Sequence, residues 1–221
     1  MRGFKIAVLT MAAITIPASA GVVGYTSRAV WTGDVGPASW TQECESFLAD
    51  TPFRTSRVVA GHLTLQQVGS STFRNQVDVL PVEFPADGAT TNNASMFTDF
   101  GATTVLMSFD ATLRAWGGDF FSVDAEGVTL ILNLLGGGTL SIDVPQGSLG
   151  TGAFFGWRTT AGEAVSSITF QSRTNNALGG EGFPLDNIAA VTAAVPEPGS
   201  GLLSGAVLLL SGLYFRTHRS R

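Results

Sequence analysis

The chain has 221 residues and a formal net charge of −5, with 27 glycines, two histidines and one cysteine. A single cysteine excludes an intrachain disulfide, and so few His and Cys residues exclude a His-rich zinc site or a Cys–His cluster. The acidic balance argues against nucleic acid as a partner, because that binding depends on a basic surface.

The first 20 residues have the pattern of a signal peptide. Arg2 and Lys5 precede an apolar run over residues 6–16, and Ala18-Ser19-Ala20 has the small side chains of a cleavage site. We therefore expect residues 1–20 to be removed after Ala20, which implies export.

The exported part is more acidic than the whole chain. The two ends hold five of the 12 basic residues, so residues 21–198 keep seven arginines against 17 acidic residues, a formal charge of −10. Such a domain stays soluble and repels anionic polysaccharide unless divalent cations bridge the two. Residues 21–194 suffice for one domain with a full core. We expect Cys44 to be a buried apolar filler, with a free thiol for pairing between chains as the alternative.

The start of this domain gives few structural signals. Within a Gly-rich lead-in, an edge strand is expected near Ala29–Thr32. The stretch Trp40–Ala49 is the one place where a helical turn is predicted. Thr41 can cap such a turn, and Glu43 and Glu45 would lie near its positive N-terminal end.

From Arg57 onward the hydrophobic period is two, which is the period of β-strands. Val128–Leu135 is a denser apolar run and is predicted to be a central strand covered on both faces. Gly136–Gly138 follows it and is the best hairpin signal in the chain. The alternating apolar residues are Leu63 and Leu65; Phe73, Val77 and Val79; Val105, Met107 and Phe109; Leu140, Ile142 and Val144; and Ile168 and Phe170. Short strands and many glycines predict an all-β fold, an antiparallel β-sandwich.

Three motifs in the second half strengthen this prediction. In chain order they are Trp116-Gly117-Gly118-Asp119, Phe154-Phe155-Gly156-Trp157 and Leu185-Asp186-Asn187-Ile188. Over Phe109–Val191 the chain resembles a jelly-roll ectodomain of exported bacterial proteins, similar to galactose-binding-like sandwiches. The resemblance implies a jelly roll. The Trp-Gly-Gly step departs from the Phe-Gly pair that is more usual there.

The last 27 residues have three parts. Val195-Pro196-Glu197-Pro198 is stiff and extended, because each proline fixes φ and lacks an N–H donor. Residues 199–215 are uncharged and apolar, and as a helix they would span roughly 25 Å, the short end for crossing a membrane. Residues 216–221 contain three arginines, the mark of a cytoplasmic end.

This order of motif, apolar helix and basic tail over residues 195–221 resembles the PEP-CTERM sorting signal of Gram-negative bacteria, whose ectodomains commonly have the jelly roll named above. The resemblance implies that an exosortase, a membrane protease-transpeptidase, recognises Val195, Pro196, Glu197 and Pro198 and releases or transfers the protein. A plain membrane anchor is the alternative.

No catalytic constellation emerges from the sequence. His62 is the one histidine of the domain, it lies beside an alternating strand, and no Gly-x-Ser-x-Gly elbow accompanies it. Seventeen acidic residues allow a glycosidase-like carboxylate pair to be drawn, but no spacing singles one out. We therefore expect no enzyme activity.

Candidate ligand contacts are few. Trp116, flanked by glycines, is expected to be exposed and to contact a ligand together with Asp186 and Asn187, whereas Trp157 is expected in the core. The only candidate cofactor is calcium, held by Asp119, Asp124 and Asp186, because Ca²⁺ prefers carboxylate and carbonyl oxygens in loops. The alternative for Asp186 and Asn187 is that they bond loop backbone groups and close the sandwich.

These observations predict an exported cell-surface or extracellular-matrix protein, sorted by an exosortase-type system, with a structural, adhesive or carbohydrate-binding role. Its expected partners are the processing enzyme, the membrane while the C-terminal helix is attached, and extracellular polysaccharide. The alternatives are a secreted carboxylate-dependent glycan-degrading enzyme and a permanently anchored surface protein.

Overall fold

The computed structural model describes residues 20–44, 46–54, 56–69, 75–79, 94–99, 104–121, 123–125, 127–146, 152–173 and 182–194. The predicted signal peptide, except Ala20, and the whole predicted sorting signal 195–221 lie outside these ranges and stay predictions. Within the described ranges, no helix is both long enough and apolar enough to span a membrane.

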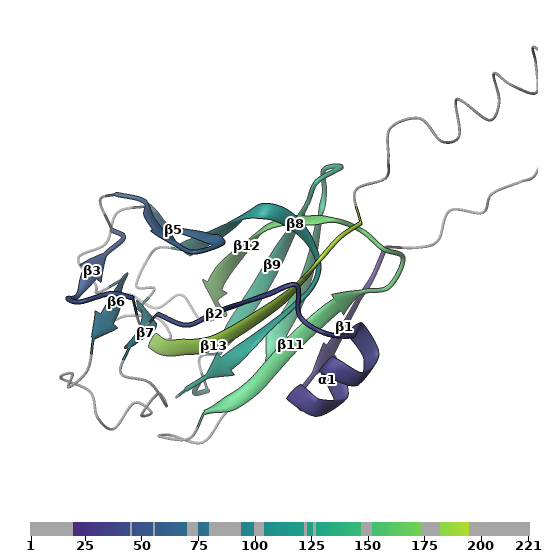
Figure 1. Ribbon diagram of the computed structural model, residues 1–221, viewed down its shortest axis with the longest axis horizontal. Helices are drawn as coiled ribbons and strands as arrows, with labels where there is room; N and C mark the ends of the chain where they lie inside the picture. The colour runs from purple at the N-terminus through teal and green to yellow at the C-terminus, as the bar shows by residue number, and fades with distance from the viewer. Residues whose placement is uncertain are drawn as a thin grey trace, which may run out of the picture.

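The described residues are mainly β-structure, with one short helix (Figure 1). The helix α1 spans Arg28–Val35, and the strands are β1 (Val22–Tyr25), β2 (Trp40–Gln42), β3 (Thr51–Pro52), β4 (Val58–Ala60), β5 (Leu63–Val68), β6 (Asn75–Val79), β7 (Ala94–Asp99), β8 (Thr104–Phe120), β9 (Val128–Leu134), β10 (Thr139–Val144), β11 (Ala153–Thr159), β12 (Val165–Ser172) and β13 (Gly182–Thr192).

The 17-residue strand β8 belongs to both layers of the fold. Its first half pairs with β5 and β12, and its second half pairs with β11 and β13. One layer therefore runs β10-β9-β12-β8-β5-β4, and the other contains β1, β11, β8, β13, β7, β6 and β3. Each of these pairings is antiparallel, and the predicted antiparallel β-sandwich of jelly-roll type is confirmed at the level of fold class.

The core between the layers follows the period of two. Leu63, Leu65, Val105 and Met107 are fully buried on neighbouring strands, while the residues between them face outward. Removing one such side chain from water stabilises the fold by about 1.5–3 kcal/mol. The largest buried side chains are Trp31, Trp116, Trp157, Phe53, Phe170 and Phe183. The predictions that Trp157 and Cys44 are buried are confirmed.

The predicted hairpin after Val128–Leu135 is confirmed. β9 and β10 pair in continuous register, and Gly137 and Gly138 have φ angles of 87° and 84°, which glycine adopts without strain. The prediction that both faces of this run are covered is wrong. Alternate residues from Val128 are buried, but Thr129 and Ile131 are only half-buried because β9 has the core on one side only.

The edge strand predicted near Ala29–Thr32 is wrong, since these residues lie in α1. The Ser27 hydroxyl caps the helix by accepting a hydrogen bond from the Val30 N–H. Trp31 and Val35, four residues apart, are the two buried side chains of the helix. Packing of this one face on the sheet holds a helix too short to be stable alone.

The helical turn predicted over Trp40–Ala49 is also wrong at its start. Trp40–Gln42 forms β2 and pairs with β13, with Trp40 opposite Ala190. The hydrogen bonds of this pairing replace those that a helix would have made, so the cap expected at Thr41 has no helix to begin. Tertiary pairing here overrides the local signal.

Candidate functional site

Two glycines on the outer face of the second layer leave room for an aromatic ring. Gly117 on β8 and Gly156 on β11 are directly paired. A Cβ atom at Gly117 would lie 2.6 Å from Cζ of Phe154, and one at Gly156 would lie 2.7 Å from the same atom. The ring can therefore lie across these strands only because both positions lack a side chain.

The helix α1 covers this face beside β1 and β11 (Figure 1). Trp31 is 1% exposed, and its ring centroid lies 5.7 Å from that of Phe154. Its indole Nε1 donates a hydrogen bond of 3.2 Å to the carbonyl oxygen of Trp157. Small side chains on β8 and β13, Ala115 and Ala189, form the rest of the surface under Trp31.

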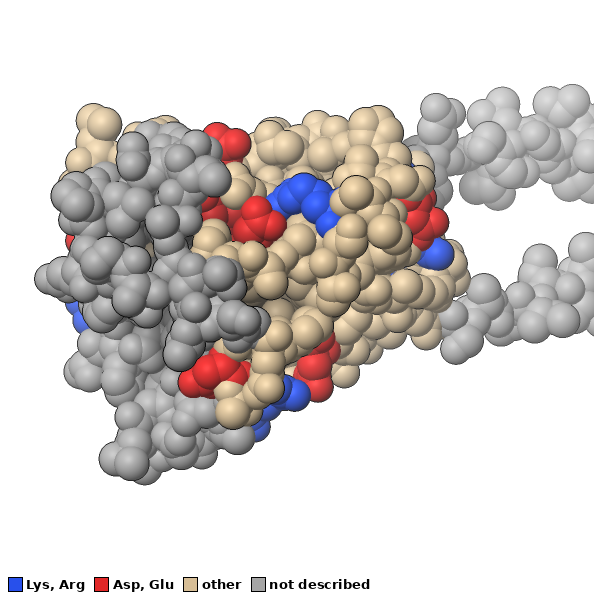
Figure 2. All heavy atoms as spheres, turned by 90° about the horizontal axis from the view of Figure 1, so that it is seen from below, with Lys and Arg blue, Asp and Glu red and all other residues tan. Residues whose placement is uncertain are grey.

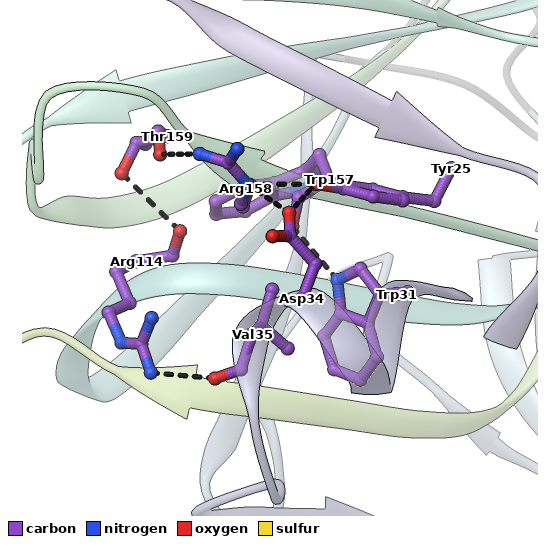
Figure 3. A network of polar contacts seen from close by, with 8 residues as sticks. All are labelled: Tyr25, Trp31, Asp34, Val35, Arg114, Trp157, Arg158 and Thr159. Carbon is purple, nitrogen blue, oxygen red and sulfur yellow. Dashed lines mark hydrogen bonds and ion pairs between the residues drawn. The ribbon is translucent and has the colours of Figure 1, made fainter. Parts of the chain in front are cut away.

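A second set of contacts fixes the C-terminal half of α1 (Figure 3). Arg158 donates to the Tyr25 hydroxyl at 2.7 Å and pairs with Asp34, which also accepts a hydrogen bond from Tyr25. Arg114 donates to the Val35 carbonyl at 2.7 Å, so a cation meets the end of the helix where carbonyls lack partners.

These contacts shift the pKa values of Asp34, Tyr25 and Arg158, and that of Arg158 is raised, first by its hydrogen bond with Asp34. Hydrogen bonds from Tyr25 and then Arg158 hold the pKa of Asp34 below its usual 3.8. Burial, and after it the hydrogen bond with Asp34, raises the pKa of Tyr25 above its usual 10.0. The network is therefore intact at neutral pH, with Asp34 ionised and Tyr25 protonated.

Arg28, at the other end of α1, joins three groups of the sheet. Its Cζ lies 4.5 Å from the centroid of the Phe154 ring, within cation–π range. Its Nη2 donates to Oδ1 of Asp119 and to the carbonyl oxygen of Asn187, each at 2.9 Å. The Nδ2 of Asn187 donates to Oδ2 of Asp119 at 3.0 Å, so the three residues form a closed triangle.

A bulge in β13 presents Asn187 to this triangle. The first residues of β13 pair with β7, and from Ile188 the strand pairs with β2. Its register against β8 shifts between Asp186 and Ala189. Asn187 has φ 49°, a left-handed conformation that asparagine tolerates better than most residues. A bulge frees backbone groups from the ladder, which explains why the Asn187 carbonyl is open to Arg28.

The triangle lies in a surface hollow of about 280 Å³, lined by Arg28, Thr41, Glu43, Asp119, Asn187 and Ile188. The side chains of Arg28 and Asp119 are 37% and 23% exposed. Among the described residues, none bonds to Nε or Nη1 of Arg28, to Oδ1 of Asn187 or to the Glu43 carboxylate. The hollow thus offers donors and acceptors side by side.

On the face of the molecule seen in Figure 2, charge on the described residues is sparse and mixed. Figure 2 shows basic groups lying next to acidic ones on the face in view, with wide uncharged areas between them. The described part of that face carries no basic patch of the kind that nucleic acid requires.

The prediction that Trp116 is exposed is wrong. Trp116 is 0% exposed and packs edge-on against Phe120 and Phe170 in the core. The flanking glycines had suggested an open position, but they make room for other side chains instead. Asp186, the second predicted ligand contact, is also buried, at 1% exposure, and does not line the hollow.

Asp119 and Asn187, predicted separately as metal and ligand residues, are brought together in the hollow. The other two predicted calcium ligands do not join Asp119 in the triangle. Asp186 lies opposite Asp119 in the pairing of β13 with β8, but the hydrogen-bond partners of Asp119 are Arg28 and Asn187. Asp124 lies in the segment after β8. The described ranges hold no group of three or more His, Cys, Asp or Glu side chains that could hold a metal ion. Calcium binding stays a prediction without support from these contacts.

His62 lies in the turn before β5 and is not a lining residue of the hollow. Its Nδ1 is 2.7 Å from Oδ2 of Asp110, and its ring stacks on that of Trp40 at a centroid distance of 5.2 Å. The sequence did not point to Arg28, whose role depends on the unpredicted helix.

No family model and no curated protein matches the chain. Among solved structures, the chain is similar to the enzymatically active domain of tailspike protein 4 from bacteriophage CBA120, at 13% identity and a TM-score of 0.36, over 60% of this chain and 19% of that chain. It is also similar to the CBM22-1 xylan-binding domain of Xyn10C from Paenibacillus barcinonensis, at 14% identity and a TM-score of 0.35, over 72% of this chain and 98% of that one. The chain spans about a fifth of the tailspike chain. Likenesses this distant carry no argument about what the present chain binds.

Proposed function

We propose that residues 21–194 form a binding domain for neutral carbohydrate and that the hollow around Arg28, Asp119 and Asn187 is its site. The observation that carries this proposal is the closed triangle, which fixes the three polar side chains while leaving donors and acceptors toward solvent. Sugar hydroxyls both donate and accept, so a mixed array of this kind suits them. Adhesion to a polysaccharide matrix would follow from such binding.

The charges of the hollow favour a neutral ligand. Asp119 and Glu43 contribute two carboxylates against the one guanidinium of Arg28. The exported part as a whole carries a formal charge of −10. A uronic acid would meet repulsion from both sources, whereas a neutral sugar would meet none.

The alternative of a glycan-degrading enzyme has one observation in its favour, because two carboxylates, Asp119 and Glu43, line one hollow. A glycosidase needs one of its carboxyl groups as a proton donor. Both oxygens of Asp119 instead accept hydrogen bonds, from Arg28 and Asn187, which is the arrangement of an ionised carboxylate. The proton donor would then have to be Glu43, whose exposed carboxylate is held in place by no described residue, and we therefore propose binding without catalysis.

Delivery to the cell surface or extracellular matrix is part of the same proposal. It is supported by the signal-peptide pattern of residues 1–20 and by the motif, apolar stretch and basic tail of residues 195–221. Mass spectrometry of the secreted protein is the test. A new C-terminus before residue 199 is expected, and an extracellular chain that still ends at Arg221 would contradict sorting. Unchanged localisation of a Pro196→Ala/Pro198→Ala variant would favour the permanent anchor.

A glycan array probed with the full-length chain tests the binding proposal. Neutral glycans should be retained and uronic-acid glycans should not. Arg28→Ala should lose the signal, while Arg57→Ala should keep it, because Arg57 also hydrogen-bonds a neighbouring side chain but lies on the other layer. Retention of no neutral glycan, or equal binding by Arg28→Ala, would contradict the proposal.

A further inference from the structure

Among the described residues that line the hollow, the one cation is Arg28 of α1, whereas the other polar groups come from β2, from Glu43 just after it, and from β8 and β13. We infer that Phe154 and Trp31, which do not line the hollow, are positioning residues of this site: Trp31 holds the Phe154 ring, and the ring holds the Arg28 guanidinium. This inference rests on the proposed function of the hollow.

The contacts form one continuous path from the sheet to the site. Gly117 and Gly156 provide the surface on which the Phe154 ring lies. The buried Trp31 ring packs against one part of Phe154 at 5.7 Å, and Arg28 lies over its face at 4.5 Å. Both Trp31 and Arg28 belong to the first turn of α1, so the same aromatic ring contacts the helix through Trp31 and supports the Arg28 cation.

The Arg28 side chain needs this support because it is long and partly exposed. Its Nη2 must reach Asp119 and the Asn187 carbonyl at the same time, and few of its rotamers do so. A partly exposed ion pair between mobile side chains contributes little by itself. A ring beneath the guanidinium restricts Arg28 before any ligand arrives, which lowers the ordering cost of binding.

The contacts at the other end of α1 hold the helix independently of Phe154. Asp34 pairs with Arg158, and the Val35 carbonyl accepts from Arg114 (Figure 3). Loss of the Phe154 ring should therefore release Arg28 without releasing the helix. This separation makes the inference testable.

The test measures the rate at which phenylglyoxal, a reagent for exposed guanidinium groups, modifies Arg28 in the full-length chain, followed by peptide mass spectrometry. Phe154→Leu keeps an apolar side chain but removes the ring, and it should raise the rate at Arg28 by about two- to fivefold. Trp31→Ala should raise it at least as much, and Trp31→Phe should stay within about twofold of the wild type because it restores a ring. Val30→Ala is the matched control, since Val30 lies on the same helix and is 61% exposed.

Arg173, paired with Asp143 on the other layer, is the internal reference and should keep its rate in every variant. Amide hydrogen exchange over α1 should be unchanged in Phe154→Leu, which shows that the helix stays docked. An unchanged Arg28 rate in both Phe154→Leu and Trp31→Ala would overturn the inference. An equal rise at Arg173 would also overturn it, because the effect would then be general loosening.

The outcome separates this inference from the proposed function. If the wild-type chain retains no neutral glycan on the array, the proposed function fails, and the Arg28 rates still report whether Phe154 and Trp31 position that side chain. If the wild-type chain retains neutral glycans but the modification rate at Arg28 is the same in all variants, the hollow binds carbohydrate without positioning of Arg28 by Phe154 and Trp31.

Discussion

At the scale of single residues, Asp119 links the two other members of the triangle. Its oxygens accept one hydrogen bond from Arg28 and one from Asn187. Replacing the carboxylate by an amide keeps the shape but makes one acceptor a donor, which would face the donating groups of its neighbours. The positions of Arg28 and Asn187 in the hollow therefore depend on the carboxylate of Asp119.

Asp119→Asn should therefore weaken glycan binding about tenfold or more, because hydrogen bonds to charged groups contribute about 1.5–3 kcal/mol. The free energy of unfolding should fall by only about 0–1 kcal/mol, since the ion pair is partly exposed. Calorimetric titration and urea denaturation measure the two effects. Asp143→Asn, which removes another partly exposed ion pair, should leave binding unchanged. Equal losses of binding in both variants would contradict a specific role for Asp119.

The network at Asp34 gives a pH dependence of known sign. Hydrogen bonds from Tyr25 and Arg158 lower the pKa of Asp34 in the folded protein, so this contribution to stability is present above pH 3.8 and is lost as the pH falls through the lower folded value. The melting temperature of the wild type should exceed that of Asp34→Asn at pH 5 to 7, and the two should converge in stronger acid. A difference that stays constant below pH 3.8 would contradict this assignment.

Single residues also show what the sequence could not reveal. Asp119 and Asn187 could be named as polar candidates from their motifs, but their contact depends on a bulge in β13. The polar pair Asp186-Asn187 within a mainly apolar strand was the available signal for that bulge. Trp116 was misjudged because glycines on one side of a residue do not show which face of the strand it occupies.

At the scale of elements, the paired glycines of β8 and β11 determine where α1 can lie. Gly117→Ala would place a Cβ atom 2.6 Å from the Phe154 ring, and the ring must then move. Overpacking of this kind costs about 1–3 kcal/mol of the free energy of unfolding. Gly136→Ala is the control, because nothing lies within 4 Å of the added atom and its φ is not positive. The midpoint of urea denaturation should be lower for Gly117→Ala than for Gly136→Ala. Equal midpoints would contradict the packing of Phe154 over Gly117.

The strands were predictable and the helix was not, for a physical reason. Strands such as β5, β9 and β12 carry the alternation of a half-buried surface, so their pattern is local. The face that α1 buries consists of two residues, Trp31 and Val35, too few to give a helical period. Its position depends on glycines more than 80 residues later in the chain.

At the scale of the whole molecule, the sandwich is combined with a formal charge of −10 over residues 21–198. The fold needs no disulfide, since its core is closed by two layers that share β8. Under the function proposed above, this charge would repel anionic polymers and would not repel neutral glycans. The sequence predicted this charge once the basic residues of the two end segments were set aside, whereas the hollow forms only where residues of α1, β2, β8 and β13 meet in the folded chain.

If the hollow binds a neutral glycan, the ligand should shift the backbone amide NMR signals of the residues that line it. The isotopically labelled full-length chain would be titrated with a neutral oligosaccharide that is retained on the array. We expect shifts concentrated at Arg28, Thr41, Asp119, Asn187 and Ile188, and their loss in Arg28→Ala. Shifts concentrated on the outer face of β9 and β12, or shifts that persist unchanged in Arg28→Ala, would contradict it.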